Sequence, residues 1–269
     1  MVENKAEYYL MSMAEERHWW YVTLHQRVFS AIKKQFGDRK NITILDAGCG
    51  TGGLWVKLLK AGYSSIKGMD VADFAIETCN EKGLSPTKAN IKQIDTVFKG
   101  QTFDVIVCND VLCYFNIRIV KDVLRKLTSL LNPGGLLIMN NPAHAAFAGT
   151  HDVAVGIQTR FNPTELKNLI VNCQLTIDNC TQWPFLLSPL IWIERKRQRS
   201  VMYKGGKILI KSDVVFPPKG NNLLLKINNI ERSLFKRAPF GSSVFIVARK
   251  EWPKMDRTKF WMGKLEDCD

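Results

Sequence analysis

The residues with the clearest chemical potential lie in the stretch ILDAGCGTGG, residues 44–53, where glycines follow a short apolar run. Gly48, Gly50 and Gly53 have the spacing G-x-G-x-x-G, and Asp70 follows about twenty positions later. In a dinucleotide-binding loop, such glycines let the backbone approach a pyrophosphate at a helix N-terminus. The glycines therefore indicate a nucleotide-like ligand, but they do not decide which one.

Two carboxylates narrow the choice of ligand. Asp46 ends the apolar run and completes Asp-x-Gly-x-Gly-x-Gly with Gly48, Gly50 and Gly52. A carboxylate there would repel a pyrophosphate, whereas it can fix the loop backbone or meet the cationic end of a ligand. Asp70 ends the run GMD, where a carboxylate can accept hydrogen bonds from both ribose hydroxyls. The alternative role for Asp70 is structural, as a cap of the helix DFAIETC.

A candidate general base is found among the four histidines of the chain. His144 and His151 lie in PAHAAFAGTHD, directly after a predicted strand, and α/β sheets place their ligands at the carboxyl ends of strands. Asp152 follows His151, and a carboxylate beside an imidazole can orient it and raise its basicity. The alternative is that both histidines make structural hydrogen bonds in a loop. Tyr114 and Arg160 are further candidate substrate contacts, although Arg160 can equally hold a loop.

The elements that would position these residues follow from the hydrophobic pattern. Strands are predicted at ITILDAG, SIKGMD, FDVIVCND and GLLIMNNP. Helices are predicted near 53–61, 73–82 and 117–131, and residues 8–36 also have helical spacing. Strands that alternate with helices predict an α/β fold with a parallel sheet covered on both faces. The segment LNPGG, residues 131–135, predicts a break before the strand that follows it.

The regular alternation of predicted strands and helices ends after residue 150. A helix is predicted to begin at Pro163, and QLTIDNCTQW and SSVFIVARK read as two further strands. Between them lie about sixty residues, with the apolar segment WPFLLSPLIWI, the basic run RKRQR, a Pro-Pro turn and an amphipathic helix around 221–236. A connection of that length usually carries a lid or a substrate wall. We predict a helical cap (1–38), a ligand-binding core (39–183), an insertion (184–240), a last core strand (241–252) and a polar tail (253–269).

Charge and composition limit the class of protein. The formal net charge of +13 divides into +4 for residues 1–150 and +9 for residues 151–269. A basic second half favours nucleic acid, an anionic membrane surface or an acidic substrate, or else is a solvated face without a ligand. No apolar run is long enough to span a membrane, and the acidic N-terminus does not resemble a secretory signal. We therefore expect a cytoplasmic protein. The seven cysteines show no C-x-x-C pair and no zinc spacing, so no metal site is expected.

Three motifs in a fixed order indicate a particular family of proteins. ILDAGCGTGG, FDVIVCNDVL and LNPGGLLIM, in this order and spacing, resemble the class I S-adenosylmethionine-dependent methyltransferases over residues 40–180. More loosely, EERHWWYVTLH, PAHAAFAGTHD, TRFNPTEL and APFGSSVFIVARK are similar to a bacterial subfamily of small-molecule methyltransferases of sugar, lipid-linked glycan or natural-product pathways. The resemblance implies a seven-stranded, mostly parallel Rossmann-like sheet with helices on both faces. It also implies an N-terminal helical cap, and an inserted lid between the last two strands.

The same resemblance assigns residues to the cofactor, S-adenosylmethionine. They are Asp46, Gly48, Cys49, Gly50, Gly52, Asp70, Val71, Asn90, Ile91, Asn109 and Asp110. The loop around Gly48 would approach the methionine part, because only residues without bulky side chains allow it. Asp70 would take the ribose hydroxyls with Val71 beside the adenine, and Asn109 and Asp110 would border the methyl group. Asn90 departs from the family, which usually has an aspartate there, so this contact lacks a charge.

The aromatic segment HWWYVTLH has two interpretations. In similar enzymes an N-terminal helix closes over the cofactor, so Trp20, Tyr21 or His25 would cap the site and exclude water. The alternative is a helix face buried on the sheet, which aromatic residues at helical spacing also indicate.

The sequence therefore predicts methyl transfer to a small-molecule or carrier-linked acceptor, most simply at oxygen with a histidine as base. A hydroxyl acceptor needs a proton acceptor, whereas a neutral amine does not. N-methylation of a small molecule or peptide, and nucleic-acid methylation by the basic half, are the alternatives; a member that binds cofactor without catalysis is a third. No N/D-P-P-Y/F tetrad occurs where CNDVLCYF lies, which disfavours nucleic acid. PFLLSPLIWIERKRQR is either a peripheral membrane contact or a lid with its basic end in solvent. The oligomeric state stays open.

Overall fold

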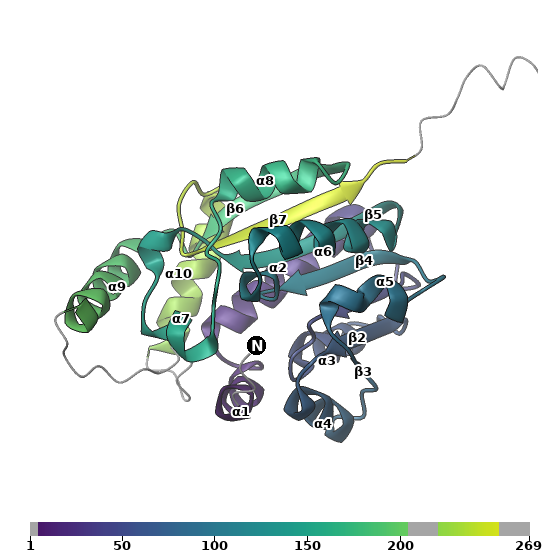
Figure 1. The fold of residues 1–269 in the computed structure, drawn as a ribbon, viewed down its shortest axis with the longest axis horizontal. Helices are drawn as coiled ribbons and strands as arrows, with labels where there is room; N and C mark the ends of the chain where they lie inside the picture. Colours follow the sequence, from purple (N-terminus) through teal and green to yellow (C-terminus); the bar gives the residue numbers. More distant parts are fainter. Residues whose placement is uncertain (1–4, 204–219, 253–269) are drawn as a thin grey trace, which may run out of the picture.

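The computed structural model describes residues 5–203 and 220–252, which form an α/β fold around a seven-stranded sheet (Figure 1). The strands lie in the order β3-β2-β1-β4-β5-β7-β6. Strand β7 is antiparallel to β5 and β6, and the other neighbouring strands are parallel. The strands are β1 Ile44–Ala47, β2 Ile66–Asp70, β3 Thr87–Lys88, β4 Phe103–Asn109, β5 Leu131–Pro142, β6 Leu175–Trp183 and β7 Ser243–Lys250. The predicted seven-stranded, mostly parallel sheet is confirmed.

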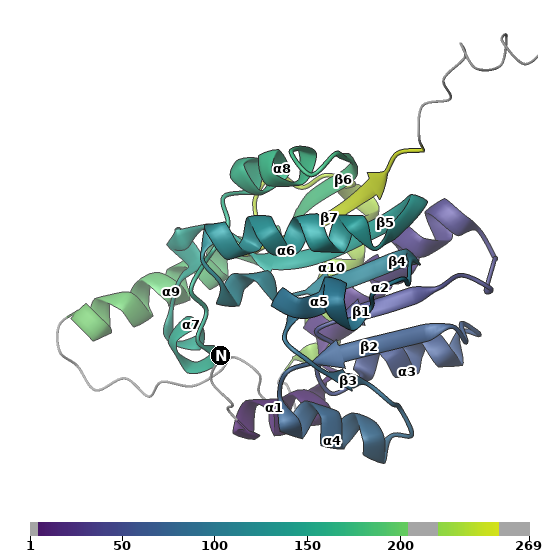
Figure 2. The same cartoon turned by 45° about the vertical axis from the view of Figure 1, so that its right-hand side comes forward.

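Helices cover both faces of this sheet. Figures 1 and 2 show α6 and α8 on one face, and α2 and α10 on the other. The α-helices are α1 Lys5–Ala14, α2 Trp19–Phe36, α3 Gly53–Lys60, α4 Asp73–Glu81, α5 Ile94–Val97, α6 Ile117–Ser129, α7 Thr150–Val155, α8 Pro163–Val171, α9 Ser188–Tyr203 and α10 Asn221–Leu234. Three 3-10 turns are η1 Ile91–Gln93, η2 Leu112–Tyr114 and η3 Ala145–Phe147. The predicted helices near 53–61, 73–82 and 117–131 correspond to α3, α4 and α6.

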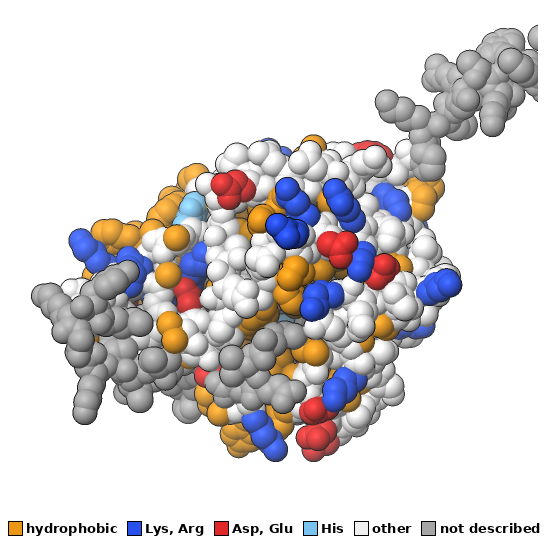
Figure 3. All heavy atoms as spheres, viewed as in Figure 1, with side chains coloured by type: hydrophobic (Ala, Val, Ile, Leu, Met, Phe, Trp, Pro, Cys, Tyr) orange, Lys and Arg blue, Asp and Glu red, His pale blue; other side chains and the backbone are white. Residues whose placement is uncertain are grey.

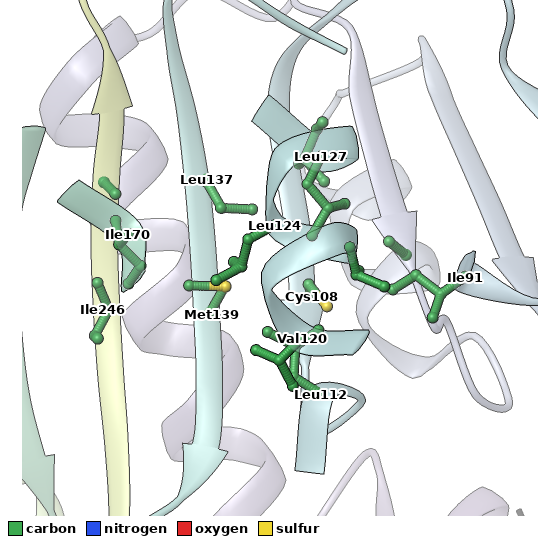
Figure 4. Close-up of a cluster of buried hydrophobic side chains, with 14 of the residues drawn as sticks. Ile91, Cys108, Leu112, Val120, Leu124, Leu127, Leu137, Met139, Ile170 and Ile246 are labelled. Atoms are coloured by element: carbon green, nitrogen blue, oxygen red, sulfur yellow. The ribbon is translucent and has the colours of Figure 1, made fainter. Parts of the chain in front are cut away.

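The larger hydrophobic core lies between α6 and the sheet. Figure 4 shows Leu124 and Leu127 of α6 facing Cys108 of β4 and Leu137 and Met139 of β5. These side chains are almost fully buried. Each such burial stabilises the fold by about 1.5–3 kcal/mol relative to an exposed side chain. The apolar runs of the sequence thus form the buried sheet, and the polar residues at the ends of the strands are available to form a site.

Two local predictions need correction. The helical segment predicted as one stretch over 8–36 is two helices, because the His18 side chain accepts the Trp20 N–H and begins α2 anew. The segment LNPGG does not end before a strand but belongs to β5, where the register against β4 shifts between Phe103 and Val105. Gly134 has φ 77°, which suits this irregular turn of the strand.

The insertion between β6 and β7 contributes two described helices. Helix α10 packs on α2, where Asn221 accepts the backbone N–H of Trp19 at 2.7 Å and Arg232 donates to Gln26 at 2.7 Å. Helix α9 lies beside α7 and contacts η3 (Figure 1). The predicted Pro-Pro turn at 217–218 and the predicted tail 253–269 lie outside the described residues. Within 5–203 and 220–252, none of the helices has the length and apolar character that crossing a membrane requires.

Candidate active site

A cavity of about 630 Å³ lies at the carboxyl ends of β1, β2, β4 and β5. Its wall also takes residues from α1, α2 and α9. The predicted site residues in this wall are Trp20, Tyr21, His25, Asp46, Gly48, Cys49, Gly50, Asp70, Val71, Asn109, Asp110, Tyr114, His151 and Arg160. Those outside it are Gly52, Asn90, Ile91, His144 and Asp152. The topology explains most of this gathering, because parallel strands deliver their carboxyl ends to one edge of the sheet.

The glycine loop joins β1 to α3 and requires glycine at two of the positions that line the cavity. Gly48 has φ 94° and Gly50 has φ 53°, a region that L-residues rarely adopt. A Cβ on Gly48 would lie 2.2 Å from Cγ2 of Val111, and one on Gly50 would lie 2.9 Å from Sδ of Met11. Both glycines line the cavity, and a side chain at either position is disfavoured by the backbone conformation and by the neighbouring side chain.

Asp70 holds the loop by its backbone. Its Oδ2 accepts the Gly50 N–H at 3.0 Å, and its Oδ1 accepts the N–H groups of Val71 and Ala72 at 2.8 and 3.0 Å. The Tyr8 hydroxyl of α1 donates to Oδ1 at 3.3 Å. Ala72 is the N-cap residue of α4, so Asp70 orders the turn before that helix and is not itself its cap. The carboxylate thus presents a fixed acceptor to the cavity, and a hydroxyl group already lies against it.

The end of the cavity around the glycine loop is acidic. Burial raises the pKa of Asp46 to about 8, and the carboxylates of Glu15 and Asp70 add to this shift. Burial raises the pKa of Asp110 to about 7, although the Asn140 amide and Arg160 partly oppose it. Negative charges crowded in a buried space each disfavour the ionisation of the others. A cation in the cavity would relieve this repulsion.

Asp110 is held at the tip of β4 by Asn140 of β5. Its backbone has φ 54°, an uncommon value outside glycine, and its N–H donates to the Asn140 carbonyl at 2.8 Å. The Asn140 side-chain amide donates to both Asp110 carboxylate oxygens at 3.0 Å. Its oxygen accepts the indole N–H of Trp183 at 2.8 Å. Next to Asp110, Asn109 Oδ1 is buried without a hydrogen-bond partner among the described residues.

The two candidate histidines occupy different places. His151 lines the cavity, and burial lowers its pKa to about 4, with Arg195 contributing to the shift. His144 lies outside the wall, where a ring nitrogen is 2.5 Å from Oε1 of Gln182. Asp152, predicted to support His151, accepts from Nε and Nη2 of Arg160 at 2.7 Å each. Arg160 is therefore a loop-holding residue in the cavity wall, since Nη1 also donates to the Ala143 carbonyl.

The aromatic segment of α2 contributes both to the core on the sheet and to the cavity wall. Leu24 packs in the core with Trp20 against it, and both residues also contribute to the cavity wall, together with Tyr21 and His25. The Trp20 ring stacks on Trp183 with centroids 5.5 Å apart. Burial lowers the pKa of His25 to about 3, and its Nδ1 lies 3.0 Å from Nζ of Lys57, so it is a neutral acceptor.

Of the three residues predicted at the adenine, Val71 lines the cavity, whereas Asn90 and Ile91 lie outside its wall. Asn90 caps η1, where its side chain accepts the Lys92 N–H, and Ile91 is buried in the core. Gly52 faces Leu84 and Cys79 and not the cavity. The motif therefore marks the right loop, but not every residue in it reaches the site.

Sequence reasoning missed two contributors to the wall. Helix α1 supplies Tyr8 and Met11, which belong to no recognisable motif, and the turn after it supplies Glu15, the first residue of EERHWWYVTLH, to which no role was assigned. Helix α9 supplies Arg195, which is buried, whereas the lid interpretation of this segment leaves the end of its basic run in solvent. Arg197 of the same run is exposed and matches that expectation.

The seven-stranded sheet and the glycine-loop cavity define a class I methyltransferase, whose methyl donor is S-adenosylmethionine. The chain belongs to the family described as methyltransferase domain, which matches its residues 38–211. This range includes the predicted core and extends into the insertion.

Relatives match the same region at modest identity. The ribosomal RNA large subunit methyltransferase I of Shewanella denitrificans is 34% identical over 134 residues, covering 43% of this chain and 33% of the relative. The malonyl-[acyl-carrier protein] O-methyltransferase of Bacillus cereus is 27% identical over 132 residues, covering 46% of each. The chain thus spans less than half the length of these curated relatives.

Solved structures extend the similarity to most of the chain. A chain of the complex between the Haloferax volcanii Trm112 methyltransferase activator and its methyltransferase gives a TM-score of 0.58 at 16% identity, covering 94% of this chain and 99% of that one. A structure described as a sarcosine dimethylglycine methyltransferase from Galdieria sulphuraria gives 0.56 at 13% identity, covering 86% of each. These similarities show that the fold is shared.

Proposed function

We propose that this methyltransferase moves a methyl group from S-adenosylmethionine to an oxygen atom of a small-molecule or carrier-linked acceptor. The donor supplies an electrophilic methyl group on a cationic sulfur. The chain supplies a pocket that holds the donor, a wall that orients the acceptor, and a group that receives a proton.

The acidic end of the cavity is the observation that carries the proposal. Asp46, Asp70, Asp110 and Glu15 all contribute to the wall around the glycine loop. In their ionised form these carboxyl groups repel a pyrophosphate and attract a sulfonium or an ammonium group. A dinucleotide therefore does not suit this loop, and a cationic nucleoside does.

The residues present fit such a donor. Gly48 and Gly50 line the cavity without side chains, so the methionine part can approach the loop backbone there. The Asp70 carboxylate, which already holds the Tyr8 hydroxyl, can bind ribose hydroxyls, with Val71 beside the base. The buried Asn109 Oδ1 lacks a partner within the described chain, and an ammonium group would satisfy it.

Two groups in the wall are suited to receive the acceptor's proton. The histidine predicted from sequence, His151, has a pKa lowered to about 4, so it is neutral near pH 7 but weakly basic. Asp110 has a pKa raised to about 7, which matches a general base at physiological pH. Asp110 also lies at the tip of β4, beside the methyl end of the proposed donor position. We therefore place the base at Asp110 and a hydrogen-bonding role at His151.

The rest of the cavity suits an acceptor of mixed character. Val155, Ile157 and Ile191 are apolar, and Tyr21 and Tyr114 are buried phenols whose pKa values burial raises. Both phenols therefore stay protonated and can donate or accept hydrogen bonds. Helix α9 of the insertion completes this part of the wall and is proposed as the lid.

Isothermal titration with S-adenosylmethionine tests the donor site. Wild type should bind, and Asp70→Ala should weaken binding about tenfold or more, because charge-assisted hydrogen bonds to the ribose are lost. Asp73→Ala is the matched control, since Asp73 lies on α4 and pairs with Lys88 at the surface. A wild-type protein that binds NADH and not S-adenosylmethionine would disprove the proposal.

Ribosomal RNA is the second candidate acceptor, because one relative acts on it and the second half of the chain is basic. On the face that Figure 3 shows, described Lys and Arg side chains are interspersed with acidic ones, which does not favour a nucleic-acid surface on that face. S-adenosylhomocysteine release with bulk RNA, compared with a panel of hydroxylated and carboxylated metabolites, separates the two acceptors. We expect release with metabolites only.

A further inference from the structure

An unassigned carboxylate lies at the N-terminus of α3. In dinucleotide-binding folds the N-terminus of the helix after the glycine loop is where the pyrophosphate sits. In this chain Glu15 lies there instead. Its Oε2 accepts the Thr51 hydroxyl at 2.6 Å, and the backbone N–H of Gly53 also hydrogen-bonds to its carboxylate. Burial raises the pKa of Glu15, while the Thr51 hydroxyl, Lys82, the Gly53 N–H and Lys57 favour its ionised form, so the chain places its own carboxyl group at the helix end.

Glu15 is buried, and several polar groups surround its carboxyl group. Only 5% of Glu15 is exposed, and a Cβ on Gly53 would lie 2.5 Å from its Oε2. The Lys82 ammonium lies 3.8 Å from the same oxygen and donates to the Thr51 carbonyl at 2.7 Å. Lys57 of α3 donates to the backbone carbonyl of Glu15 at 3.1 Å. The Thr51 hydroxyl, the N-terminus of α3, Lys82 and Lys57 therefore all lie at or close to Glu15.

We infer that Glu15 determines the cofactor specificity of the loop: its carboxylate fills the phosphate position, so the cavity accepts a cationic nucleoside and rejects nucleoside phosphates. A phosphate group brought to α3 would have to displace Glu15 or share a buried space with it. Both cost free energy, since the first leaves a buried carboxylate without its donors and the second places like charges together. The inference rests on the proposed donor site.

The same contact also fastens α1 over the loop. Glu15 directly follows α1, while Met11 lies against Gly50 and Tyr8 against Asp70. Figures 1 and 2 both show α1 beside α4, at the β2 end of the site. Losing the Glu15 carboxylate should therefore loosen α1 as well as open the phosphate position. These two effects can be measured separately.

Titration calorimetry with S-adenosylhomocysteine, ADP and NADH tests the inference on wild type, Glu15→Gln and Glu15→Ala. Wild type should bind S-adenosylhomocysteine and neither phosphate ligand. Glu15→Ala should bind ADP about tenfold or more tightly than wild type does, because the helix end is freed for phosphate. Glu15→Gln keeps the volume and the Thr51 hydrogen bond but loses the charge, so it should show a smaller gain. Glu16→Gln, at the exposed neighbouring residue, should behave as wild type.

Hydrogen exchange supplies a second readout. Amides of α1 should exchange faster in Glu15→Ala than in Glu16→Gln, while amides of β4 and β5 stay protected and show that the fold is intact. Unchanged ratios of S-adenosylhomocysteine to ADP affinity in both Glu15 variants would overturn the inference. So would NADH binding by wild type. If wild type binds no S-adenosylhomocysteine but Glu15→Ala still gains ADP affinity, the proposed donor fails while the role of Glu15 in excluding phosphate stands.

Discussion

The Asn140 side-chain amide donates to both carboxylate oxygens of Asp110, each at 3.0 Å. The orientation of this amide is fixed by chemistry, because the Trp183 indole N–H can only donate and therefore faces the amide oxygen. The amide nitrogen must then point at Asp110. A chain of hydrogen bonds thus runs from β6 through β5 to the tip of β4 and holds the carboxylate in one position at the cavity wall.

Asp110→Asn should lower the rate of methyl transfer to a hydroxyl acceptor by about a hundredfold or more, because general base catalysis contributes on that scale. The substitution keeps the shape of the side chain, so affinity for S-adenosylhomocysteine should change much less. Release of S-adenosylhomocysteine and calorimetry measure the two effects. His151→Gln should cost less than Asp110→Asn, and His144→Gln should leave the rate nearly unchanged, since His144 lies outside the cavity wall. A rate that survives Asp110→Asn but not His151→Gln would return the base to the histidine.

Asn140→Leu tests the role of Asp110 as the base through the pKa of its carboxyl group. The Asn140 amide favours the ionised form of Asp110, so its removal should raise the pKa of Asp110 above about 7. The acidic limb of the pH profile of methyl transfer should then move to higher pH. A structural defect alone would lower the rate at every pH without moving the limb.

The affinity for S-adenosylmethionine should increase with pH relative to that for S-adenosylhomocysteine. The pKa values of Asp110 and Asp46 are raised to about 7 and about 8, so both carboxyls are largely protonated at low pH and lose their protons across this window. The two ligands differ by the sulfonium charge, which only the ionised carboxylates attract. We expect the affinity ratio to increase about tenfold between about pH 6 and about pH 8.

Calorimetry in buffers of different ionisation enthalpy checks the cause. S-adenosylmethionine should release protons on binding near pH 7, whereas S-adenosylhomocysteine should release fewer. Asp46→Asn should reduce both the proton release and the pH dependence of the ratio. A ratio that is flat from about pH 6 to about pH 8 would mean that these carboxyls do not face the sulfonium.

The parts of the site predictable from sequence are those set by strand topology. Asp46, Asp70 and Asn109 each end an apolar run, and a parallel sheet brings such ends to one edge without further information. The glycine loop was predictable for the same reason, since it joins the first of these strands to a helix. The sheet itself followed from the alternation of apolar runs and amphipathic segments.

Contacts made by packing over long sequence distances were not predictable in this way. Glu15 meets Thr51 only because α1 folds back over the loop, and no local period encodes that. Asp152 was expected to serve its neighbour His151, but the turn after α7 brings Arg160 to it instead. Asn140 carried an unused signal, because a polar residue inside an apolar strand needs a partner.

The Asp152–Arg160 pair gives the last prediction, which concerns stability. Their side chains are 10% and 8% exposed, and the guanidinium makes two parallel hydrogen bonds to the carboxylate. Asp152→Asn removes the charge but leaves Arg160 buried and ionised. Breaking one side of a buried pair costs about 3–5 kcal/mol of the free energy of unfolding. Chemical denaturation of wild type and variant measures this loss.

The chain contains its own control in Asp178, which makes the same two-bond contact with Arg249 between β6 and β7. These side chains are 27% and 26% exposed, so water screens the pair and Asp178→Asn should cost only about 0–1 kcal/mol. If Asp152 serves only to hold Arg160, its substitution should lower stability while the pH profile of methyl transfer keeps its shape. If it tunes His151 instead, the profile should shift and stability should change little. Equal destabilisation by both substitutions would show that the Arg160 pair is not sealed from solvent as the structure places it.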